Sequence, residues 1–391
     1  MDFDLSPDQL ALQTRATEAG LEFRDRARQW DAEDSAPYRE INQRMGELGF
    51  FGLTMPKEYG GQGGTALDYL IATSAVFRAS QTWQPCEPLF CTTGPGPAML
   101  LLSDSEELKQ KYVSAIVRGE MGCAIALTEP KHGSDLNHLE TTATIVGDEI
   151  VLDGDKSFVT GAVDNELYAV FARFDGIPGH RGIGAVVVEG DAEGVTLERG
   201  PSFVGLRGLA HGNVTLRNAR VPLTNLIQGP GSFARLMTAF NLERLHNAAF
   251  TLGMAEAAFD EATDFVKRRH AFGRPVIEFQ ATYHTLAEMW TVIEAHRMLC
   301  YRAAATAIDG TFPQGLPVTI AKLFGGTRLP DLTVKALELH GGYGVDLDYP
   351  IQRIHRDAVS AIVAGGAPAV LRNSIASQLF PDVRFRQERE G

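Results

Sequence analysis

The chain has 391 residues, 44% of them hydrophobic, which is enough for two or three domains with large apolar cores. Asp and Glu number 49 against 36 Lys and Arg, which gives a formal net charge of −13. Because nucleic-acid-binding proteins usually carry a basic face, this balance argues against a nucleic-acid partner.

Cysteine spacing argues against two further classes of protein, those held by disulfides and those that bind zinc. No two cysteines have the CxxC spacing, and no histidine stands at metal-ligand spacing from any of the four, which are Cys86, Cys91, Cys123 and Cys300. A disulfide framework and a zinc site are both unsupported, so we expect no bound metal and a reducing cytoplasm as the setting.

The first eight residues, Met-Asp-Phe-Asp-Leu-Ser-Pro-Asp, are acidic where a signal or transit peptide would be basic. No stretch approaches the roughly 20 apolar residues of a membrane span. These features predict a soluble, cytoplasmic protein that does not enter a membrane.

The first third of the chain has helical patterns. Ser6-Pro-Asp-Gln9 combines a capping residue, Pro at the first helical position and Gln three residues later, which predicts a helix start. Helical patterns continue to about Gly119. Two Gly- and Pro-rich stretches, residues 60–64 and 94–97, are predicted loops.

The middle of the chain, from about residue 121 to 228, changes to short β-branched runs bounded by glycines. We predict strands at Ala143 to Val146, Ile150 to Leu152, Leu167 to Phe174, Ala185 to Val188, Val195 to Leu197 and Val214 to Leu216. Long helical patterns return from about residue 232. Apolar residues there recur every three or four positions from Leu242 to Ala262, as in a buried helical stripe.

A long motif in the middle region identifies a family. Cys123-Ala-Ile-Ala-Leu-Thr-Glu-Pro-Lys-His-Gly-Ser-Asp135, followed by Lys156-Ser-Phe-Val-Thr-Gly161, resembles the flavin-site signature of the acyl-CoA dehydrogenases. The resemblance implies that Thr128 hydrogen-bonds the isoalloxazine, Ser134 lies along the acyl-pantetheine path and Thr160 faces flavin N5. Phe158 stands where many members carry a Trp against the flavin. Each hydroxyl taken alone is more often part of a turn or strand; their joint spacing favours the ligand role.

A second match is Arg269-His-Ala-Phe-Gly273, completed by Gln280. In homotetrameric relatives this stretch crosses to the FAD of a neighbouring subunit. The resemblance places Arg269 near the pyrophosphate, where a forked guanidinium is suited to phosphate, and Phe272 and Gln280 near the adenosine half. As an isolated fragment it would be interpreted as an ordinary helix C-terminus with basic residues.

A third match, Glu338-Leu-His-Gly-Gly-Tyr-Gly344, resembles the family stretch whose backbone approaches the FAD diphosphate. The glycines, including Gly341 and Gly342, permit a contact that a Cβ would block. The run is not a dinucleotide fingerprint, because no strand precedes it and the GxGxxG spacing is missing. Most relatives have Gln where this chain has Glu338, and a carboxylate there would repel phosphate.

These and smaller matches extend over nearly the whole chain. The resemblance implies an α+β protein with an N-terminal helical domain (residues 1–120), a middle β-barrel-like domain (121–228) and a C-terminal four-helix bundle (229–391). It also implies tightly bound FAD and a homotetramer, with a dimer as the alternative.

The catalytic base is the point where this chain departs from many relatives. They place a Glu near the C-terminus, but the matching stretch here, Ile362 to Arg372, has no carboxylate and carries Gly365 at that position. A branch that includes isovaleryl-CoA dehydrogenase instead has its base in a Leu-Glu-Arg-Leu segment, which corresponds to Leu242–Leu245. We therefore assign the base to Glu243, a substrate contact to Arg244, and a backbone N–H for the thioester carbonyl to Gly365.

Three functions remain open at this stage. The leading hypothesis is FAD-dependent α,β-dehydrogenation of an acyl thioester, carried on CoA or an acyl carrier protein, with an electron-transfer flavoprotein as acceptor. A flavin monooxygenase or oxidase on the same fold is the first alternative, although it would not need an α-proton base. The second is a non-catalytic family member that acts as an oligomer partner. Glu338 and Gly365 suggest it because they depart from the family pattern, and so do Ala367 and Ala369, which replace residues that help to hold FAD in relatives.

Overall fold

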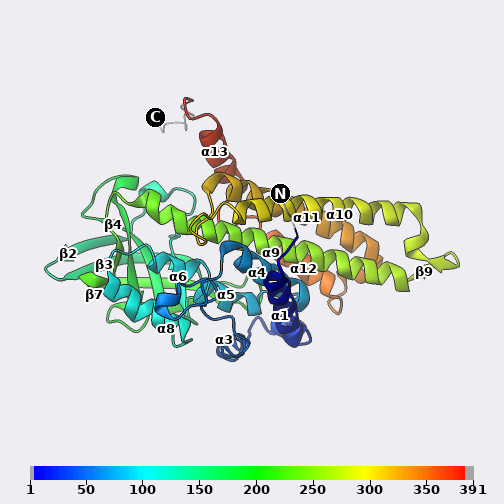
Figure 1. Ribbon diagram of the computed structural model, residues 1–391, viewed down its shortest axis with the longest axis horizontal. Helices are drawn as coiled ribbons and strands as arrows, with labels where there is room; N and C mark the ends of the chain where they lie inside the picture. Colours follow the sequence, from blue (N-terminus) through cyan, green and yellow to red (C-terminus); the bar gives the residue numbers. More distant parts are fainter. Residues whose placement is uncertain (1–3, 384–391) are drawn as a thin grey trace.

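The computed structural model describes residues 4–383. The molecule is elongated: a sheet occupies one end, long helices run from it to the other end, and the N-terminal helices pack along one side (Figure 1). Helices before and after a central sheet are the arrangement predicted from the sequence, and the α+β class is confirmed. The limits of the three domains remain a prediction.

The N-terminal part is helical. A capping box starts the first helix: Gln9 N donates to Ser6 Oγ at 3.3 Å, and Ser6 N donates to Gln9 Oε1 at 3.0 Å, as the sequence predicts. A π-helical turn, Lys109–Val113, joins α7 to α8. The helices are α1 Pro7–Arg24, α2 Ala27–Glu33, α3 Tyr38–Glu47, α4 Ala66–Ser80, α5 Glu87–Thr92, α6 Pro95–Leu100, α7 Glu106–Leu108 and α8 Ser114–Val117.

The predicted loop at residues 94–97 is wrong, because α6 begins at Pro95. Proline is tolerated at the first helical position, where its fixed φ suits the helix and its missing N–H is not needed. Gly96 has a packing role: an ideal Cβ there would lie 1.8 Å from the Cys123 carbonyl oxygen. The glycine therefore allows α6 to lie directly against the sheet.

The middle part is an eight-stranded sheet with the order β6-β7-β3-β2-β4-β5-β8, and β1 pairs with β4 in parallel. All six predicted strand segments lie in strands. Two short strands, β1 and β8, were not singled out in the sequence. The bounds are β1 Cys123–Ala126, β2 Thr142–Val146, β3 Glu149–Thr160, β4 Leu167–Phe174, β5 Ile183–Glu189, β6 Val195–Arg199, β7 His211–Pro222 and β8 Leu226–Gln228.

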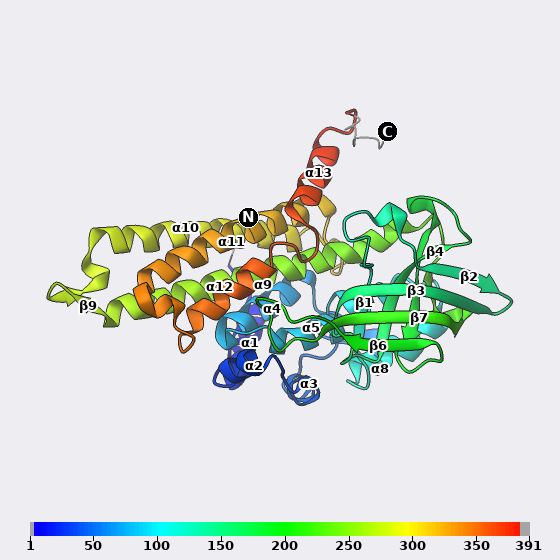
Figure 2. The ribbon, with the colours of Figure 1, turned by 180° about the vertical axis from the view of Figure 1, so that it is seen from behind.

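The C-terminal part is built around α9, whose 36 residues give a length of about 54 Å. Its predicted apolar stripe from Leu242 to Ala262 is buried except for the partly buried Phe259. A small hairpin of β9 and β10 joins α9 to α10, and α13 projects from the body (Figure 2). The bounds are α9 Phe233–Arg268, β9 His270–Ala271, β10 Arg274–Pro275, α10 Gln280–Ala304, α11 Gly315–His340, α12 Pro350–Ser360 and α13 Pro368–Leu379. Nowhere in residues 4–383 is a helix both long and apolar enough to cross a membrane.

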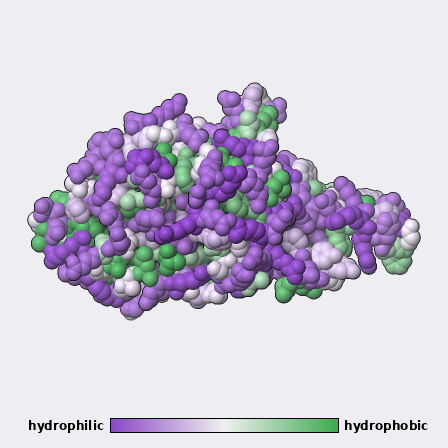
Figure 3. All heavy atoms as spheres, turned by 90° about the horizontal axis from the view of Figure 1, so that it is seen from below, coloured by the Kyte–Doolittle hydropathy of each residue, from purple (hydrophilic) through white to green (hydrophobic). Residues whose placement is uncertain are grey.

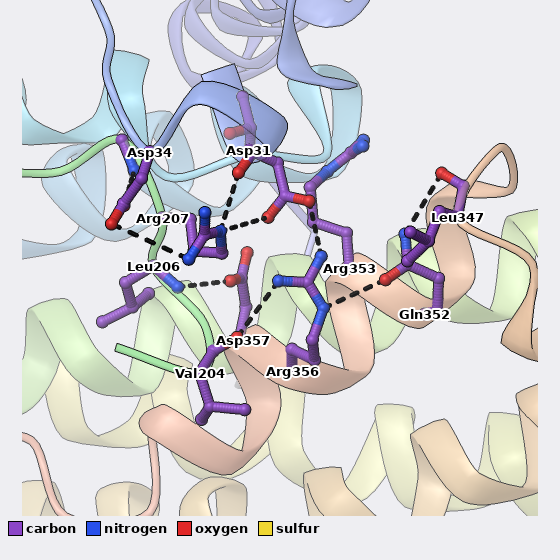
Figure 4. A network of polar contacts seen from close by, with 12 residues as sticks. Asp31, Asp34, Val204, Leu206, Arg207, Leu347, Gln352, Arg353, Arg356 and Asp357 are labelled. Carbon is purple, nitrogen blue, oxygen red and sulfur yellow. Dashed lines mark hydrogen bonds and ion pairs between the residues drawn. The ribbon is translucent and has the colours of Figure 1, made fainter. Parts of the chain in front are cut away.

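The three parts meet at one polar network, drawn in Figure 4. Arg356 Nη2 of α12 donates to Asp31 Oδ2 of α2 at 2.6 Å. The loop between β6 and β7 joins both helices, since Leu206 N donates to Asp357 Oδ1 at 2.6 Å and Arg207 Nε donates to the Asp31 carbonyl at 2.7 Å. The network fixes this loop, which follows the sheet edge near the predicted flavin contacts.

Candidate active site

A buried ion pair holds the two halves of the first motif together. Lys156 and Glu129 are 1% and 4% exposed, and Lys156 Nζ donates to Glu129 Oε1 at 2.8 Å. Burial acts to raise the pKa of Glu129. The charge of Lys156 and hydrogen bonds from Thr141 and Glu140 nevertheless keep this pKa below its usual value. Burial lowers the pKa of Lys156 to about 8. Both charged residues lie inside the quoted motif, yet the sequence alone gave no reason to pair them.

Two of the predicted hydroxyls, those of Thr128 and Thr160, lie along the second half of β3, an interior strand of the sheet. Ser157 N donates to the Thr128 carbonyl at 2.9 Å, and Thr160 ends β3. Thr128 and Thr160 are partly buried, and Ser134 is exposed. Across residues 4–383, no hydrogen bond engages the side-chain hydroxyl of any of the three, so all three are free to contact a ligand.

An aromatic surface lies beside these hydroxyls. Phe158 occupies a bulge in β3, has a positive φ of 57° and is 57% exposed. Its ring stacks on Phe203 at 6.0 Å between centroids, and Phe203 lies 4.6 Å from the ring of His211. His211 pairs with Thr160 across the strands, and burial lowers its pKa to about 4, so its imidazole is neutral. His211 and Phe203 were missed in the sequence, since neither belongs to a recognisable motif.

Glu243 lies on α9 between the buried side chains of Leu242 and Leu245. Burial raises its pKa to about 7, while the charges of Arg244 and Lys322 act in the opposite direction. Although the side chain is partly buried, no hydrogen bond or ion pair engages its carboxylate in the described part of the chain. A carboxyl group with few stabilising partners and a pKa near neutrality has the properties of a general base.

Gly365 lies against the same face of α9. Asn247, one helical turn beyond Glu243, donates from Nδ2 to the Glu243 carbonyl at 3.0 Å. An ideal Cβ at Gly365 would be 2.7 Å from that Asn247 Nδ2, and the φ of Gly365 is +66°. Both the contact and the left-handed conformation disfavour a side chain at this position. A carboxylate at position 365 would require the loop or Asn247 to move.

Arg244 is held by its own helix. Its Nη1 donates to Asn241 Oδ1 at 3.2 Å, and its guanidinium lies 5.7 Å from the centre of the Phe240 ring. Burial lowers its pKa, and its buried Nε has no partner in the described residues. One donor of this guanidinium is therefore left for a further group.

The second and third motifs meet at the far end of α9. A cavity of about 460 Å³ is lined by Arg269, Glu338, Gly341 and Gly342 among others. Nothing lies within 4 Å of an ideal Cβ at either glycine, so the backbone is open to the cavity. Arg269 lies over the ring of Tyr343 at 5.7 Å. The resemblance of two separate motifs to the family predicts these four residues near the FAD diphosphate, and the fold brings them to one cavity.

Phe272 lies at the tip of the hairpin of β9 and β10, and Gln280 follows it at the start of α10. Phe272 is 96% exposed with a φ of +52°, and Gln280 is exposed at the start of α10. Figure 3 shows a mainly hydrophilic face with scattered apolar groups, one of them at the end of the molecule that β9 occupies in Figure 1. A large apolar side chain so exposed at a hairpin tip is suited to contact another molecule.

The predicted site residues thus form two separate groups. Glu243 lies in the first third of α9, and Arg269 is the residue just past its C-terminal end, 26 positions later, which corresponds to about 39 Å along the helix axis. Figure 1 likewise shows the β9 hairpin at the end of the molecule opposite the sheet. Within one chain, Glu243 and the pyrophosphate-side residues therefore lie toward opposite ends of α9.

A second buried carboxyl group has a similar shift. Burial raises the pKa of Glu87 to about 7. Glu87 is fully buried, however, and accepts hydrogen bonds from Trp83 Nε1 at 3.2 Å and Cys91 Sγ at 3.1 Å. Because its oxygens are occupied and closed off, Glu87 is less suited than Glu243 to receive a proton from a substrate.

The three parts of the chain match the three domain models of one family. The models described as acyl-CoA dehydrogenase N-terminal, middle and C-terminal domain match residues 6–120, 124–219 and 232–380. The chain belongs to the acyl-CoA dehydrogenase family, as the motifs indicate.

Individual relatives agree with this assignment. The chain is similar to a glutaryl-CoA dehydrogenase of Desulfococcus multivorans, with 33% identity over 96% of this chain and 97% of that protein. It is similar to a subunit of a caffeyl-CoA reductase-Etf complex of Acetobacterium woodii, with 32% identity over 90% and 92%. The structure of butyryl-CoA dehydrogenase from Megasphaera elsdenii superposes with a TM-score of 0.92 at 28% identity, over 97% of this chain and 100% of that chain. The chain is an oxidoreductase of the acyl-CoA dehydrogenase type.

Proposed function

We propose that this protein is a FAD-dependent dehydrogenase that forms the α,β double bond of an acyl-CoA, with Glu243 as the base. The observation that carries the proposal is the environment of Glu243: a partly buried carboxylate that receives no hydrogen bond from residues 4–383, with a pKa raised to about 7 by burial, on the face of α9 that the Gly365 loop contacts. A base near neutrality is matched to removing a weakly acidic α-proton at physiological pH.

Gly365 and Arg244 are assigned the other contacts to the substrate. The Gly365 N–H is assigned to the thioester carbonyl, where a donor stabilises the negative charge that develops as the α-proton leaves. Arg244, whose buried Nε has no partner among the described residues, is assigned to a polar group of the substrate. FAD, when bound, supplies the acceptor for the hydride that leaves the β-carbon.

The residues present fit FAD. The free hydroxyls of Thr128, Ser134 and Thr160 and the exposed ring of Phe158 would hold the flavin end. Neutral donors of this kind suit an isoalloxazine, whose charge develops on reduction.

Arg269, Phe272, Gln280, Glu338, Gly341 and Gly342 would hold the pyrophosphate and adenosine end. Because about 39 Å of α9 separates these residues from Glu243, the proposal assigns them to the FAD of a second copy. A homotetramer is the proposed assembly, and a dimer is the smallest one that satisfies this requirement.

Two further assignments follow from the relatives. A relative in a caffeyl-CoA reductase-Etf complex supports an electron-transfer flavoprotein as the redox partner. Relatives named for CoA thioesters favour CoA over an acyl carrier protein, which offers the same phosphopantetheine arm. The cytoplasm is the proposed location, and the acyl chain itself remains to be identified.

The test is an anaerobic titration of the purified protein with a panel of acyl-CoAs and acyl carrier proteins, following loss of flavin absorbance. We expect the wild type to bleach with one class of acyl thioester. Glu243→Gln should keep its FAD and bleach about 100- to 10,000-fold more slowly, since that is the usual contribution of a general base. Glu261→Gln, on the same helix and paired with Arg24, is the matched control and should bleach normally.

Other outcomes favour the alternative functions. Protein that purifies without flavin and takes none up would be a non-catalytic oligomer partner. Rapid oxygen consumption by the reduced protein would favour a monooxygenase or oxidase. Equal bleaching by the wild type and Glu243→Gln would remove Glu243 from the base role.

A further inference from the structure

Lys322 is a buried cation that the proposed reaction has not used so far. It lies on α11, and its side chain is 1% exposed. Within residues 4–383, no carboxylate lies within ion-pair distance of its ammonium group. Because an isolated buried charge is costly, the structure around this ammonium must compensate for it.

The compensation comes from one loop. Lys322 Nζ donates to the Ile362 carbonyl at 2.9 Å and to the Gly366 carbonyl at 2.8 Å. In the described part of the chain, no other side chain hydrogen-bonds the backbone of residues 362–367. The two carbonyls are four residues apart and enclose Gly365, so the ammonium group closes the turn from which the Gly365 N–H is presented.

This turn is difficult to maintain without such a closure. Gly365 and Gly366 have φ values of +66° and +118°, and glycine loses more conformational freedom on folding than any other residue. The nearby backbone contributes a single bond inside the turn, from Gly366 N to the Val363 carbonyl. Two charge-assisted hydrogen bonds from a rigid helix supply the remaining restraint.

The same cation acts on Glu243. Burial raises the pKa of Glu243, whereas the charges of Arg244 on its own helix and of Lys322 on α11 lower it. Burial lowers the pKa of Lys322 to about 8, while Glu243 acts to raise it and Arg244 to lower it. At pH 7 Lys322 therefore remains mostly protonated and opposes protonation of Glu243.

We propose that Lys322 is a positioning residue for this reaction: its ammonium group closes the 362–366 turn and thereby holds the Gly365 N–H against the α9 face that carries Glu243. The inference rests on the proposed function, because it assigns the support of the two groups that act on the thioester. Lys322 itself touches neither substrate nor cofactor in this proposal.

The test compares Lys322→Met with Lys335→Met, which removes an ammonium group from the exposed side of the same helix, where Lys335 pairs with Glu288. Amide hydrogen exchange of peptides covering residues 361–367 is measured on the cofactor-free protein. The Glu243 carboxyl is titrated by infrared difference spectroscopy, with Glu243→Gln as the reference. FAD content and kcat are measured on the reconstituted protein.

We expect Lys322→Met to exchange at least about 10-fold faster in residues 361–367, because its turn loses two hydrogen bonds. The Glu243 midpoint should rise, and kcat at pH 7 should fall up to about 100-fold with FAD content unchanged, the loss typical of a misplaced reacting geometry. Lys322→Arg should keep the Glu243 midpoint, because it keeps the charge, and should still exchange faster, because a planar guanidinium does not replace a compact ammonium group.

Unchanged exchange and an unchanged Glu243 midpoint in Lys322→Met would overturn the proposal. If Lys322→Met does not fold, Lys322→Arg decides by the exchange rate alone, and normal exchange overturns the proposal. A wild type that does not dehydrogenate any thioester, combined with faster exchange and a shifted midpoint in Lys322→Met, would refute the proposed function while leaving the structural role of Lys322 intact.

Discussion

The two ends of α9 present opposite environments. Near its start, Glu243 lies between buried leucines and is acted on by the charge of the buried Lys322, and the Gly365 loop contacts Asn247 one turn further along. Past its end, Arg269 is exposed and lines an open cavity of about 460 Å³ with glycine backbone and the carboxylate of Glu338. The first end is completed by its own chain, and the second is open to another molecule.

This difference shows how one long helix can carry a proton-transfer group near one end and lead to a phosphate-binding group at the other. A proton-transfer group needs desolvation to acquire a pKa near neutrality, and α9 obtains this by packing against α4 and α11. A group that binds phosphate needs to remain charged and accessible, which the exposed C-terminal end permits. Changes at either end of the helix would test this contrast.

Moving the base to the loop should fail. In Glu243→Ala combined with Gly365→Glu, the new side chain meets Asn247 and must adopt a left-handed φ. We expect kcat at least about 100-fold below that of the wild type, the minimum usual loss of a general base, measured by anaerobic bleaching. Glu243→Ala alone is the reference. Recovery to near wild-type rates would mean that the contact with Asn247 does not determine where the base lies.

Removing the far-end guanidinium should weaken cofactor binding. Arg269→Ala should raise the Kd for FAD about 10- to 100-fold, because hydrogen bonds to charged groups contribute about 1.5 to 3 kcal/mol. The measurement is a flavin fluorescence titration of the cofactor-free protein. Arg268→Ala is the control, since that neighbouring side chain donates to the Asp264 carbonyl and does not line the cavity. Equal affinities for the two variants would contradict the assignment of Arg269.

The near end should impose a pH dependence. Glu243 acts as its carboxylate, and burial raises its pKa to about 7. Below that value kcat/KM should fall about 10-fold per pH unit as the carboxylate is protonated, and above it the rate should level off. Stopped-flow bleaching between pH 5 and 9, with FAD content checked at each pH, measures this profile. A flat profile between pH 5 and 7 would show that the base has an ordinary carboxyl pKa.

Neutralising the far-end carboxylate should have the smallest effect. Glu338→Gln removes a negative charge from the cavity that contains Arg269, and FAD should bind about 2- to 5-fold more tightly, as expected for an exposed charge. Isothermal titration with the cofactor-free protein is the measurement. Asp331→Asn, exposed on the same helix, is the control. Weaker binding in Glu338→Gln would mean that the carboxylate contacts the cofactor favourably.

Local signals in the sequence predicted much of the fold. The capping residues at Ser6 and the β-branched runs of the middle region determine the local structure of a few neighbouring residues. They can therefore be recognised in the sequence without knowledge of tertiary contacts. The loop prediction at residues 94–97 is wrong because Pro and Gly usually favour loops. Here Gly96 is required for another reason, since α6 packs at this point against the Cys123 carbonyl of β1. That requirement exists only after α6 and β1 have met.

The candidate site was predicted from motifs and only in part. The resemblance of their motifs to the family indicated Glu243, Arg269 and the glycines, and Arg269 and Gly341 line one cavity although more than seventy positions separate them. Lys322 and His211 gave no signal, because a lysine on a helix and a histidine in a strand are ordinary residues until their neighbours are known. Their environments come from packing between distant elements.

The network of Figure 4 also bears on the order in which the chain is made. Arg356 and Asp31, joined at 2.6 Å, are 325 residues apart in the sequence. During synthesis Asp31 therefore has no Arg356 partner until 325 further residues have been added, and the loop containing Leu206 lacks its Asp357 acceptor until the ribosome has passed that codon. Contacts of such high sequence separation form late and slowly. The middle sheet can assemble before that point, but the loop beside Phe158 acquires its final place only after α12 has been made.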